Sequence, residues 1–438
     1  MFGTIETPAW AFYLVVLFAA VTFASHFLFP SVRWFFRRRA ERVVAELNKR
    51  LPRPIEPFKL LRRQDMIQRV IYDPEVVRAV AEYAREEGMR EDVGFEKARD
   101  YAREIVPSFS ASAYYGIGIR LARFVATKLF DVRLTYVDRE ALDNIDPDAT
   151  VVFVMNHRSN FDYVLVTYLA AQHSALSYAA GEWARVWPMS PVIRSMGAYF
   201  IRRRNLSPLY RRVLASYVQK ATEAGVTQAV FPEGGLSRDG AVGKAKLGIL
   251  SYIAEAQGRD VVFVPVSIAY DRVVEDRVLV AAGRTGRRQF RGSIFEGLRF
   301  ALRYIWRRIR GKVGRFGVAA VSFGRPVPEH EVTGGVEELG ERLIGDIRKE
   351  MPITTAASAA AALLSLGGQA EFRAILQAMV PQTDQRDPEA LQQVLDIMVM
   401  RHILSKETDS YTIKDPELVE FYANALPISV AVQKSTAT

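Results

Sequence analysis

The feature that most constrains this chain is an alternation of short apolar runs with longer helical patterns. The apolar runs read TVVFVM at 150–155, VVFVPVSIA at 261–269 and VAAVSF at 318–323, with shorter ones at 132–137 and 228–231. Continuous apolar runs of this length are typical of strands that a sheet buries on both faces. Between two of them, Ser207 and Pro208 indicate a helix start and Gly225 a helix end. We therefore expect an α/β fold, with a mixed, mostly parallel sheet and helices on both faces.

The chain is too long for one hydrophobic core. It has 438 residues, whereas single cores stop growing at roughly 250–300 residues. We predict a transmembrane anchor at 1–30, a helical, basic, membrane-proximal region at 31–130, the α/β domain at 131–333 and a C-terminal helical region at 334–438. Within the last region, 367–425 should form a small helical unit with a short strand at 409–413.

The predicted anchor is the apolar stretch 9–29. It contains no acidic residue, lysine or arginine, and a helix needs about 20 such residues to cross a bilayer. Pro30 ends the stretch, and an arginine-rich segment follows, which is typical of the cytoplasmic side of a span. We therefore expect a single-pass anchor with the rest of the chain in the cytoplasm. The alternatives are a signal peptide, which the lack of a preceding basic residue disfavours, and a partly buried helix or re-entrant hairpin.

The charge of the chain points to anionic partners. Its formal net charge is +10 at pH 7. The segments 114–130 and 297–316 are predicted to be amphipathic helices with basic and apolar faces, and such helices can lie on an anionic membrane. The alternative is a helix packed on the domain with its arginines in water. The basic residues form no known nucleic-acid-binding motif, so we expect no nucleic-acid partner.

Several classes of chemistry are excluded by missing residues or motifs. The chain has no cysteine, so disulfides, thiolate metal sites and a cysteine nucleophile are ruled out. It also lacks a P-loop, a convincing dinucleotide fingerprint, a metal-ligand spacing of histidine and acidic residues, and the Gly-x-Ser-x-Gly motif of serine esterases. We expect neither a metal nor a cofactor.

His157 and Asp162 are the candidate catalytic pair. They follow the buried run at 150–155 directly, and strand ends are where α/β folds place reactive groups. A carboxylate can hold an imidazole in the tautomer that leaves its second nitrogen free as a base near neutral pH. A histidine with an aspartate five residues later also arises by chance, so the pair needs support from the residues around it.

Two further polar clusters follow β-like runs. One contains Glu233, Gly234, Gly235 and Arg238, with Lys246 downstream, and the other ends in three arginines at 202–204. A glycine pair can bring backbone N–H groups close to a ligand, and the cations would attract a phosphate or carboxylate. The alternatives are a tight turn, a surface ion pair and solvated arginines.

Four segments together resemble a known family. NHRSNFDY, GAYFIRR, FPEGGLSR and VPVSIAYDRV, in this order over Asn156–Val273, are similar to the four blocks of the glycerolipid acyltransferases. HRS, GG and IAYDRV resemble the glycerol-3-phosphate and dihydroxyacetone-phosphate branch more closely than the lysophosphatidate branch. LVEFYANAL at 418–426 weakly resembles the tail of the same branch, whereas the first 110 residues match nothing in it.

The resemblance implies a role for each matching residue. His157 would be the general base that deprotonates the acceptor hydroxyl, Asp162 would orient it, and the alkoxide would attack the thioester of acyl-CoA or acyl-carrier protein. Such transfer needs no protein nucleophile, which agrees with the absence of cysteine. Acceptor binding would fall to the remaining matches: Arg158, Arg202, Arg203, Glu233, Gly234, Gly235, Arg238 and Lys246.

The resemblance therefore implies a glycerol-3-phosphate 1-O-acyltransferase, which carries out the first step of phospholipid biosynthesis at the cytoplasmic face of the cell inner membrane. Glycerol 3-phosphate, the acyl donor and membrane phospholipids would be its partners. The family commonly has arginine where this chain has Leu236, which leaves dihydroxyacetone phosphate and lysophosphatidate open as acceptors. An alternative outside the enzymes is that the chain is a non-catalytic protein that binds anionic lipid at a membrane surface.

Overall fold

The computed structural model describes most of the chain. The described residues are 8–10, 12–18, 42, 44–46, 48–49, 53, 55–61, 63–170, 175–181, 189–202, 206–285, 303–304, 306–307, 310, 314–381 and 387–427. Two compact units are present, Met1–Ile55 and Glu56–Thr438. The region boundaries predicted at residues 30, 130 and 333 stay predictions.

The first unit contains the start of the predicted anchor. Its described residues between 9 and 18 are helical and exposed, including Trp10, Tyr13 and Phe18. Within the described part of the chain, no helix combines the length and the apolar character that a membrane crossing requires. Residues 19–41, which hold the rest of the anchor and most of its basic flank, lie outside the described residues, so the anchor stays a prediction.

The second unit is built on an eight-stranded sheet with the order β1-β7-β6-β2-β5-β3-β4, in which β8 also pairs with β6. Every pairing is parallel except those of β6 with β7 and β8. The predicted mixed, mostly parallel sheet is thus confirmed. The strands are β1 Asp131–Tyr136, β2 Thr150–Met155, β3 Ser177–Ala180, β4 Ala198–Phe200, β5 Gln228–Val230, β6 Val261–Tyr270, β7 Val318–Phe323 and β8 Val327–Pro328.

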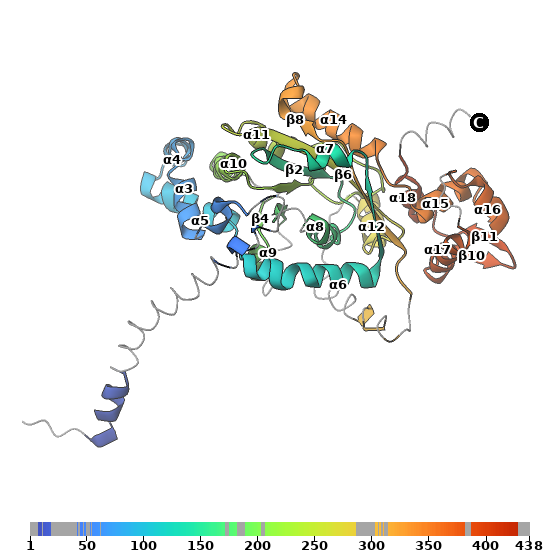
Figure 1. Ribbon diagram of the computed structural model, residues 1–438, viewed down its shortest axis with the longest axis horizontal. Helices are drawn as coiled ribbons and strands as arrows, with labels where there is room; N and C mark the ends of the chain where they lie inside the picture. Colours follow the sequence, from blue (N-terminus) through green and yellow to red (C-terminus); the bar gives the residue numbers. More distant parts are fainter. Residues whose placement is uncertain are drawn as a thin grey trace, which may run out of the picture. The chain divides into compact units, whose positions relative to one another are not determined.

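Helices cover both faces of this sheet (Figure 1). One face carries α3 Arg63–Ile71, α4 Pro74–Glu86, α5 Glu91–Ile105, α10 Pro208–Glu223, α11 Gly248–Ala254 and α14 Gly335–Lys349. The other carries α6 Ile119–Leu129, α8 Asp162–Ala170, α12 Asp276–Thr285 and α15 Thr355–Ser365. Shorter turns complete the unit: α2 Pro57–Leu60, the π-helix η1 Ser112–Gly118, α7 Arg139–Asp143, α9 Met189–Ser195 and the 3-10 helix η3 Glu329–Glu331.

The predicted helix starts and ends are present in α10. Ser207 Oγ accepts a hydrogen bond from the backbone N–H of Tyr210, Pro208 occupies the first turn, and Gly225 follows the helix with a φ of 79°. The helix predicted at 114–130 begins as the π-helix η1 and continues as α6. The helix predicted at 297–316 lies largely outside the described residues.

The C-terminal region contains more strand than the sequence predicts. Besides the predicted strand, β11 Ser410–Ile413, it has β9 Gln369–Glu371 and β10 Leu404–Glu407, which flank β11 in a three-stranded antiparallel sheet. Both additional strands are short and partly exposed, so they leave little hydrophobic pattern. The remaining helices are α16 Phe372–Ala378, α17 Pro388–Met400 and α18 Pro416–Ala423.

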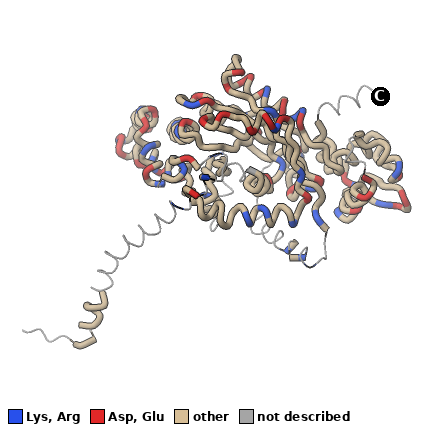
Figure 2. The backbone as a smooth tube through the Cα atoms, viewed as in Figure 1, with Lys and Arg blue, Asp and Glu red and all other residues tan. Residues whose placement is uncertain are grey.

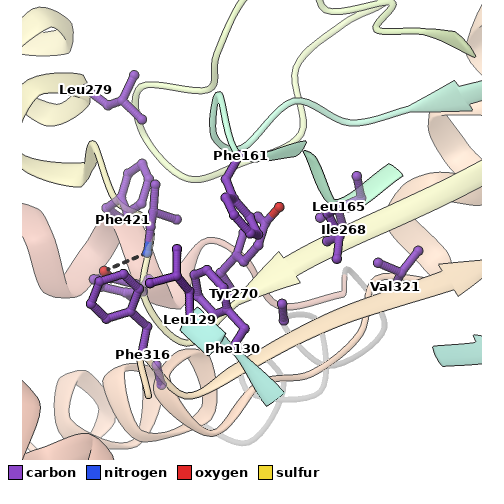
Figure 3. Packing of buried hydrophobic residues seen from close by; sticks show 14 of the residues in the cluster. Leu129, Phe130, Phe161, Leu165, Ile268, Tyr270, Leu279, Phe316, Val321 and Phe421 are labelled. Carbon is purple, nitrogen blue, oxygen red and sulfur yellow. Dashed lines mark hydrogen bonds between the residues drawn. The ribbon is translucent and has the colours of Figure 1, made fainter. Parts of the chain in front are cut away.

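An aromatic cluster joins three elements near the end of β6. The ring of Phe130, just after α6, lies 5.0 Å from that of Phe161 and 5.3 Å from that of Tyr270, measured between centroids. Figure 3 shows these three rings packed together within the hydrophobic core. The cluster fixes the loop that precedes α8 against the end of β6, which is where the candidate catalytic residues lie.

Candidate active site

The first motif begins where β2 ends. The side-chain amide of Asn156 donates to Ile268 O at 2.9 Å, and its oxygen accepts from Ile268 N at 2.7 Å. Asn156 therefore extends the hydrogen bonding between β2 and β6 by one residue, with its side-chain amide in place of backbone groups. This pairing places the next residue, His157, at the carboxyl edge of the parallel part of the sheet.

His157 and Asp162 form the predicted pair. His157 Nδ1 lies 2.9 Å from Asp162 Oδ2, within hydrogen-bonding distance. The pairing of Nδ1 with a carboxylate favours the tautomer in which Nδ1 carries the proton, and Nε2 is then the nitrogen with a free lone pair. The short loop between β2 and α8 makes this geometry possible, because Asp162 is the first residue of α8.

Asp162 is itself held on all sides. Its Oδ2 also accepts the backbone N–H groups of Arg158 at 2.8 Å and Ser159 at 3.1 Å. Its Oδ1 accepts the hydroxyl of Tyr270 at 2.6 Å. The carboxylate is fully buried, so these donors replace the water that would otherwise solvate its charge. The result is an imidazole partner with little freedom to move.

Two aromatic rings surround the imidazole. Phe231 stacks on it with a centroid distance of 4.2 Å, and Tyr163 packs edge-on at 5.5 Å. His157 is only 1% exposed. The imidazole is therefore shielded from bulk water, and its orientation is set by packing as well as by Asp162.

Glu233 connects the first and third motifs. Its Oε1 accepts the backbone N–H of His157 at 2.8 Å, and its Oε2 accepts that of Gly243 at 2.9 Å. Burial raises the pKa of Glu233, while these two hydrogen bonds and the charge of Arg158 act in the opposite direction. Both oxygens thus bind protein backbone, and the acceptor contact that the resemblance implies for Glu233 stays a prediction.

The glycines of the third motif permit a close approach of Lys246. Gly234 has a φ of 65°, and a Cβ added there would lie 2.9 Å from Lys246 Cδ. The backbone N–H of Lys246 also donates to Pro232 O at 2.7 Å. A side chain at Gly234 would therefore displace Lys246 from this turn, and Gly235 follows in the same partly exposed segment.

Arg158 is a buried cation beside the catalytic pair. It is 3% exposed, and its Nε and Nη2 have no hydrogen-bond partner among the described residues. Burial lowers its pKa, whereas the charges of Glu233, Asp162 and Asp239 raise it. Its guanidinium thus offsets the negative charge that gathers around His157.

The other predicted arginines are placed differently. Arg202 forms a two-point ion pair with Glu104 of α5, with Nε–Oε1 and Nη2–Oε2 distances of 2.8 Å and 2.6 Å, and this pair raises its pKa. Arg238 extends along α12 and reaches Ala282 O at 3.5 Å. Arg203 lies outside the described residues. Leu236, where the family commonly has arginine, packs against the hydrophobic core.

Sequence reasoning missed three residues that hold the site together. Tyr270 donates to Asp162, Ser237 N donates to His157 O at 2.9 Å, and Glu275 accepts the hydroxyl of Ser159 at 2.6 Å. Tyr270 and Ser237 lie inside two of the segments that resemble the family, so this resemblance could have identified them as site residues. Glu275 lies outside them, 116 residues from Ser159, and no local pattern connects the two.

These contacts define what the arrangement can do. A buried imidazole with one nitrogen held by a carboxylate is suited to remove a proton from a hydroxyl. No group of three or more acidic or histidine side chains among the described residues could hold a metal ion.

Comparison with known proteins agrees with this chemistry. Residues 136–269 match the family model described as Acyltransferase. A glycerol-3-phosphate acyltransferase of Pseudomonas syringae pv. tomato is 30% identical over 62% of this chain and 32% of its own length. Proteins of the same name are 29% identical in Pseudomonas entomophila, over 66% of this chain and 34% of theirs, and 30% identical in Shewanella amazonensis, over 68% and 37%.

The chain spans about a third of the length of these curated relatives. A solved structure, the 1-acyl-sn-glycerophosphate (LPA) acyltransferase PlsC from Thermotoga maritima, aligns with 55% of this chain and 83% of its own at 20% identity. Its TM-score of 0.33 is too low to support an argument. The family resemblance seen in the four motifs is confirmed by the family model and the curated relatives: residues 136–269 match the Acyltransferase model, and about two thirds of the chain is similar to proteins named glycerol-3-phosphate acyltransferase.

Proposed function

We propose that this chain transfers a fatty acyl group from acyl-CoA or acyl-carrier protein to the 1-hydroxyl of glycerol 3-phosphate and so produces lysophosphatidate. The observation that carries the proposal is the buried pair of His157 and Asp162, with 2.9 Å between Nδ1 and Oδ2. The curated relatives are named for the same reaction. No metal or cofactor is required for this transfer.

The geometry of the pair supports a reaction in which His157 is the general base. Nε2 of His157 takes the proton of the acceptor hydroxyl as its oxygen attacks the thioester carbonyl carbon. The tetrahedral intermediate then collapses, the carbon–sulfur bond breaks, and the imidazolium returns its proton to the leaving thiolate. Asp162, which accepts four hydrogen bonds, stabilises the imidazolium that forms on His157.

The rings around His157 support transfer over hydrolysis. Phe231 and Tyr163 flank the imidazole, and the residue is almost fully buried. Because so little of the imidazole is exposed, few water molecules can lie beside the base, which disfavours hydrolysis of the thioester.

The acceptor is proposed to be a small phosphate ester. Arg158 lies in the first motif, Arg202 in the second and Arg238 in the third, and Lys246 lies downstream of the third motif. Binding of a phosphate near Arg202 would have to share that guanidinium with Glu104. Direct competition among glycerol 3-phosphate, dihydroxyacetone phosphate and lysophosphatidate for a labelled acyl donor tests the assignment. Preferential formation of lysophosphatidate is expected, and preferential formation of phosphatidate would overturn it.

We further propose that the protein acts at a membrane, with phospholipids as partners and the catalytic domain on the cytoplasmic side. The exposed apolar helix at the start of the chain supports an anchor. In the second unit, Ile117, Leu121 and Phe124 are exposed at helical spacing along η1 and α6. Figure 2 shows lysines and arginines along α6, and residues 112–129 include no acidic residue. Exposed apolar side chains flanked by cations fit an anionic lipid surface.

A further inference from the structure

The C-terminal helix α18 lies against two loops of the active site. One is the loop 237–243, which follows the third motif. The other is the segment 271–276, which contains the connection from β6 to α12 and the first residue of α12. Both segments also contact the first motif, so α18 has a route to the catalytic residues that the sequence does not reveal.

The loop 237–243 contacts α18 through its own backbone atoms. Gly240 has a φ of 83°, and a Cβ added there would lie 1.8 Å from the carbonyl oxygen of Phe421 in α18. The side-chain amide of Asn424, at the C-cap of α18, donates to Asp239 O at 2.9 Å. The loop therefore lies directly on the end of α18, with no space for a side chain between them.

The loop carries this contact to His157. Ser237 Oγ accepts the backbone N–H of Gly240 at 3.1 Å, and Ser237 N donates to His157 O at 2.9 Å. At the other end of the loop, Gly243 N donates to Glu233, which in turn accepts the N–H of His157. Both backbone polar groups of His157 are thus bonded to the loop or to the residue that the loop holds.

The contact with segment 271–276 is a buried polar network. The hydroxyl of Tyr422 in α18 donates to Asp276 Oδ2 at 2.6 Å, and Arg401 binds Asp276 Oδ1 at 2.6 Å. Asp276 and Tyr422 are 1% and 2% exposed. The preceding residue, Glu275, accepts hydrogen bonds from Ser159 Oγ and Asn160 N. Through Glu275, segment 271–276 thus holds Ser159 and Asn160 in the middle of the first motif.

We propose that α18, through Asn424 and Tyr422, positions the acceptor-binding third motif and His157 for catalysis. This inference rests on the proposed acyl transfer. It assigns a role to a part of the chain, 416–426, that lies about 260 residues from His157 in sequence and carries no group that touches the reacting atoms. Asn424, Tyr422 and Gly240 are positioning residues in this scheme.

The most informative variant is Asn424→Ala, because Asn424 is exposed and its loss removes one hydrogen bond without opening the core. We expect the KM for glycerol 3-phosphate to rise about threefold to tenfold, with little change in the KM for the acyl donor or in the melting temperature. Glu420→Ala, an exposed position one turn earlier in α18, is the matched control and should leave all three unchanged. Gly240→Ala, which forces the loop away from Phe421, should raise the same KM further.

Hydrogen–deuterium exchange of the peptide 237–247 provides a second readout that is independent of turnover. Faster exchange in Asn424→Ala than in Glu420→Ala, together with the selective rise in KM, is the expected result. The positioning role would be overturned if Asn424→Ala left the KM for glycerol 3-phosphate unchanged. It would also be overturned if the variant lost kcat only in proportion to a lower melting temperature. If the wild type acylates no acceptor, the proposed function fails, and the exchange data alone then decide whether α18 restrains the loop.

Discussion

Asp162 is the residue on which the geometry of the active site converges. It accepts four hydrogen bonds, one from the imidazole of His157, two from backbone N–H groups and one from Tyr270. An asparagine offers one oxygen and turns an NH2 group toward the remaining donors. We expect Asp162→Asn to lower kcat by about 10²-fold or more.

Tyr270→Phe is the graded companion to this change, because it removes one of the four hydrogen bonds and keeps the ring that packs on Phe130. We expect a loss of about tenfold, which is the scale of one hydrogen bond to a charged group. Initial rates of thiol release, measured beside thermal melting of each variant, test both. An Asp162→Asn protein that melts and turns over like the wild type would contradict the orienting role.

Glu233 makes stability depend on pH in a defined direction. Burial raises its pKa above the usual 4.5, against the hydrogen bonds from Gly243 and His157. The folded state therefore holds the proton to higher pH than the unfolded state. The resulting stabilisation is complete below the unfolded pKa and is lost as pH rises through the folded pKa.

Glu233→Gln removes this titration. We expect the free energy of unfolding of the wild type to fall relative to that of the variant as pH rises from about 4.5. Urea unfolding of both proteins at several pH values measures the difference. If the free energy of unfolding of the wild type instead rose relative to that of the variant over this pH range, the pKa of Glu233 would be lowered in the folded state.

At the scale of elements, α10 is a helix whose start and end follow from its own sequence. Ser207 caps its N-terminus, and ten of its residues are buried between the sheet and the helices α3, α4, α5 and α11. We expect Ser207→Ala to lower the free energy of unfolding by about 1 kcal/mol. Ser207→Asp should lower it much less, because a carboxylate can also cap the helix. Urea denaturation measures both, and equal losses in the two variants would argue against a capping role.

The elements that sequence could predict are those with long patterns. β2, β6 and β7 appear as continuous apolar runs, and the structure has them within one residue of the predicted bounds. β3 was not predicted: it is four residues long, and in so short a run periodicity does not distinguish a strand from a loop. Pairing order was also beyond reach, because it depends on contacts between segments far apart in the chain.

The same limit applies to the candidate site. His157 and Asp162 are five residues apart, so their pairing could be predicted from spacing and family resemblance. Arg202 was predicted to meet a substrate anion, and its partner in the structure is Glu104, which is 98 residues away. The link from α18 to the site depends on tertiary contacts of this kind.

At the scale of the whole molecule, the proposed membrane contact predicts a single orientation. Since the chain has no cysteine, Leu121→Cys on α6 and Glu341→Cys on α14 can each be labelled alone with an environment-sensitive fluorophore. The two helices cover opposite faces of the sheet (Figure 1). We expect the probe at 121 to shift to the blue on anionic vesicles and to be quenched by lipid-borne quenchers, while the probe at 341 remains accessible to iodide. Equal responses at both positions would contradict docking through α6.

Acyl transfer by His157 is the central claim, and thiol release from acyl-CoA tests it most directly. The purified protein in detergent would be assayed with and without glycerol 3-phosphate, beside His157→Ala. We predict release that requires the acceptor and disappears in the variant. Release that persists in His157→Ala, or no release from the wild type with any of the three acceptors and either acyl-CoA or acyl-carrier protein as donor, would contradict it.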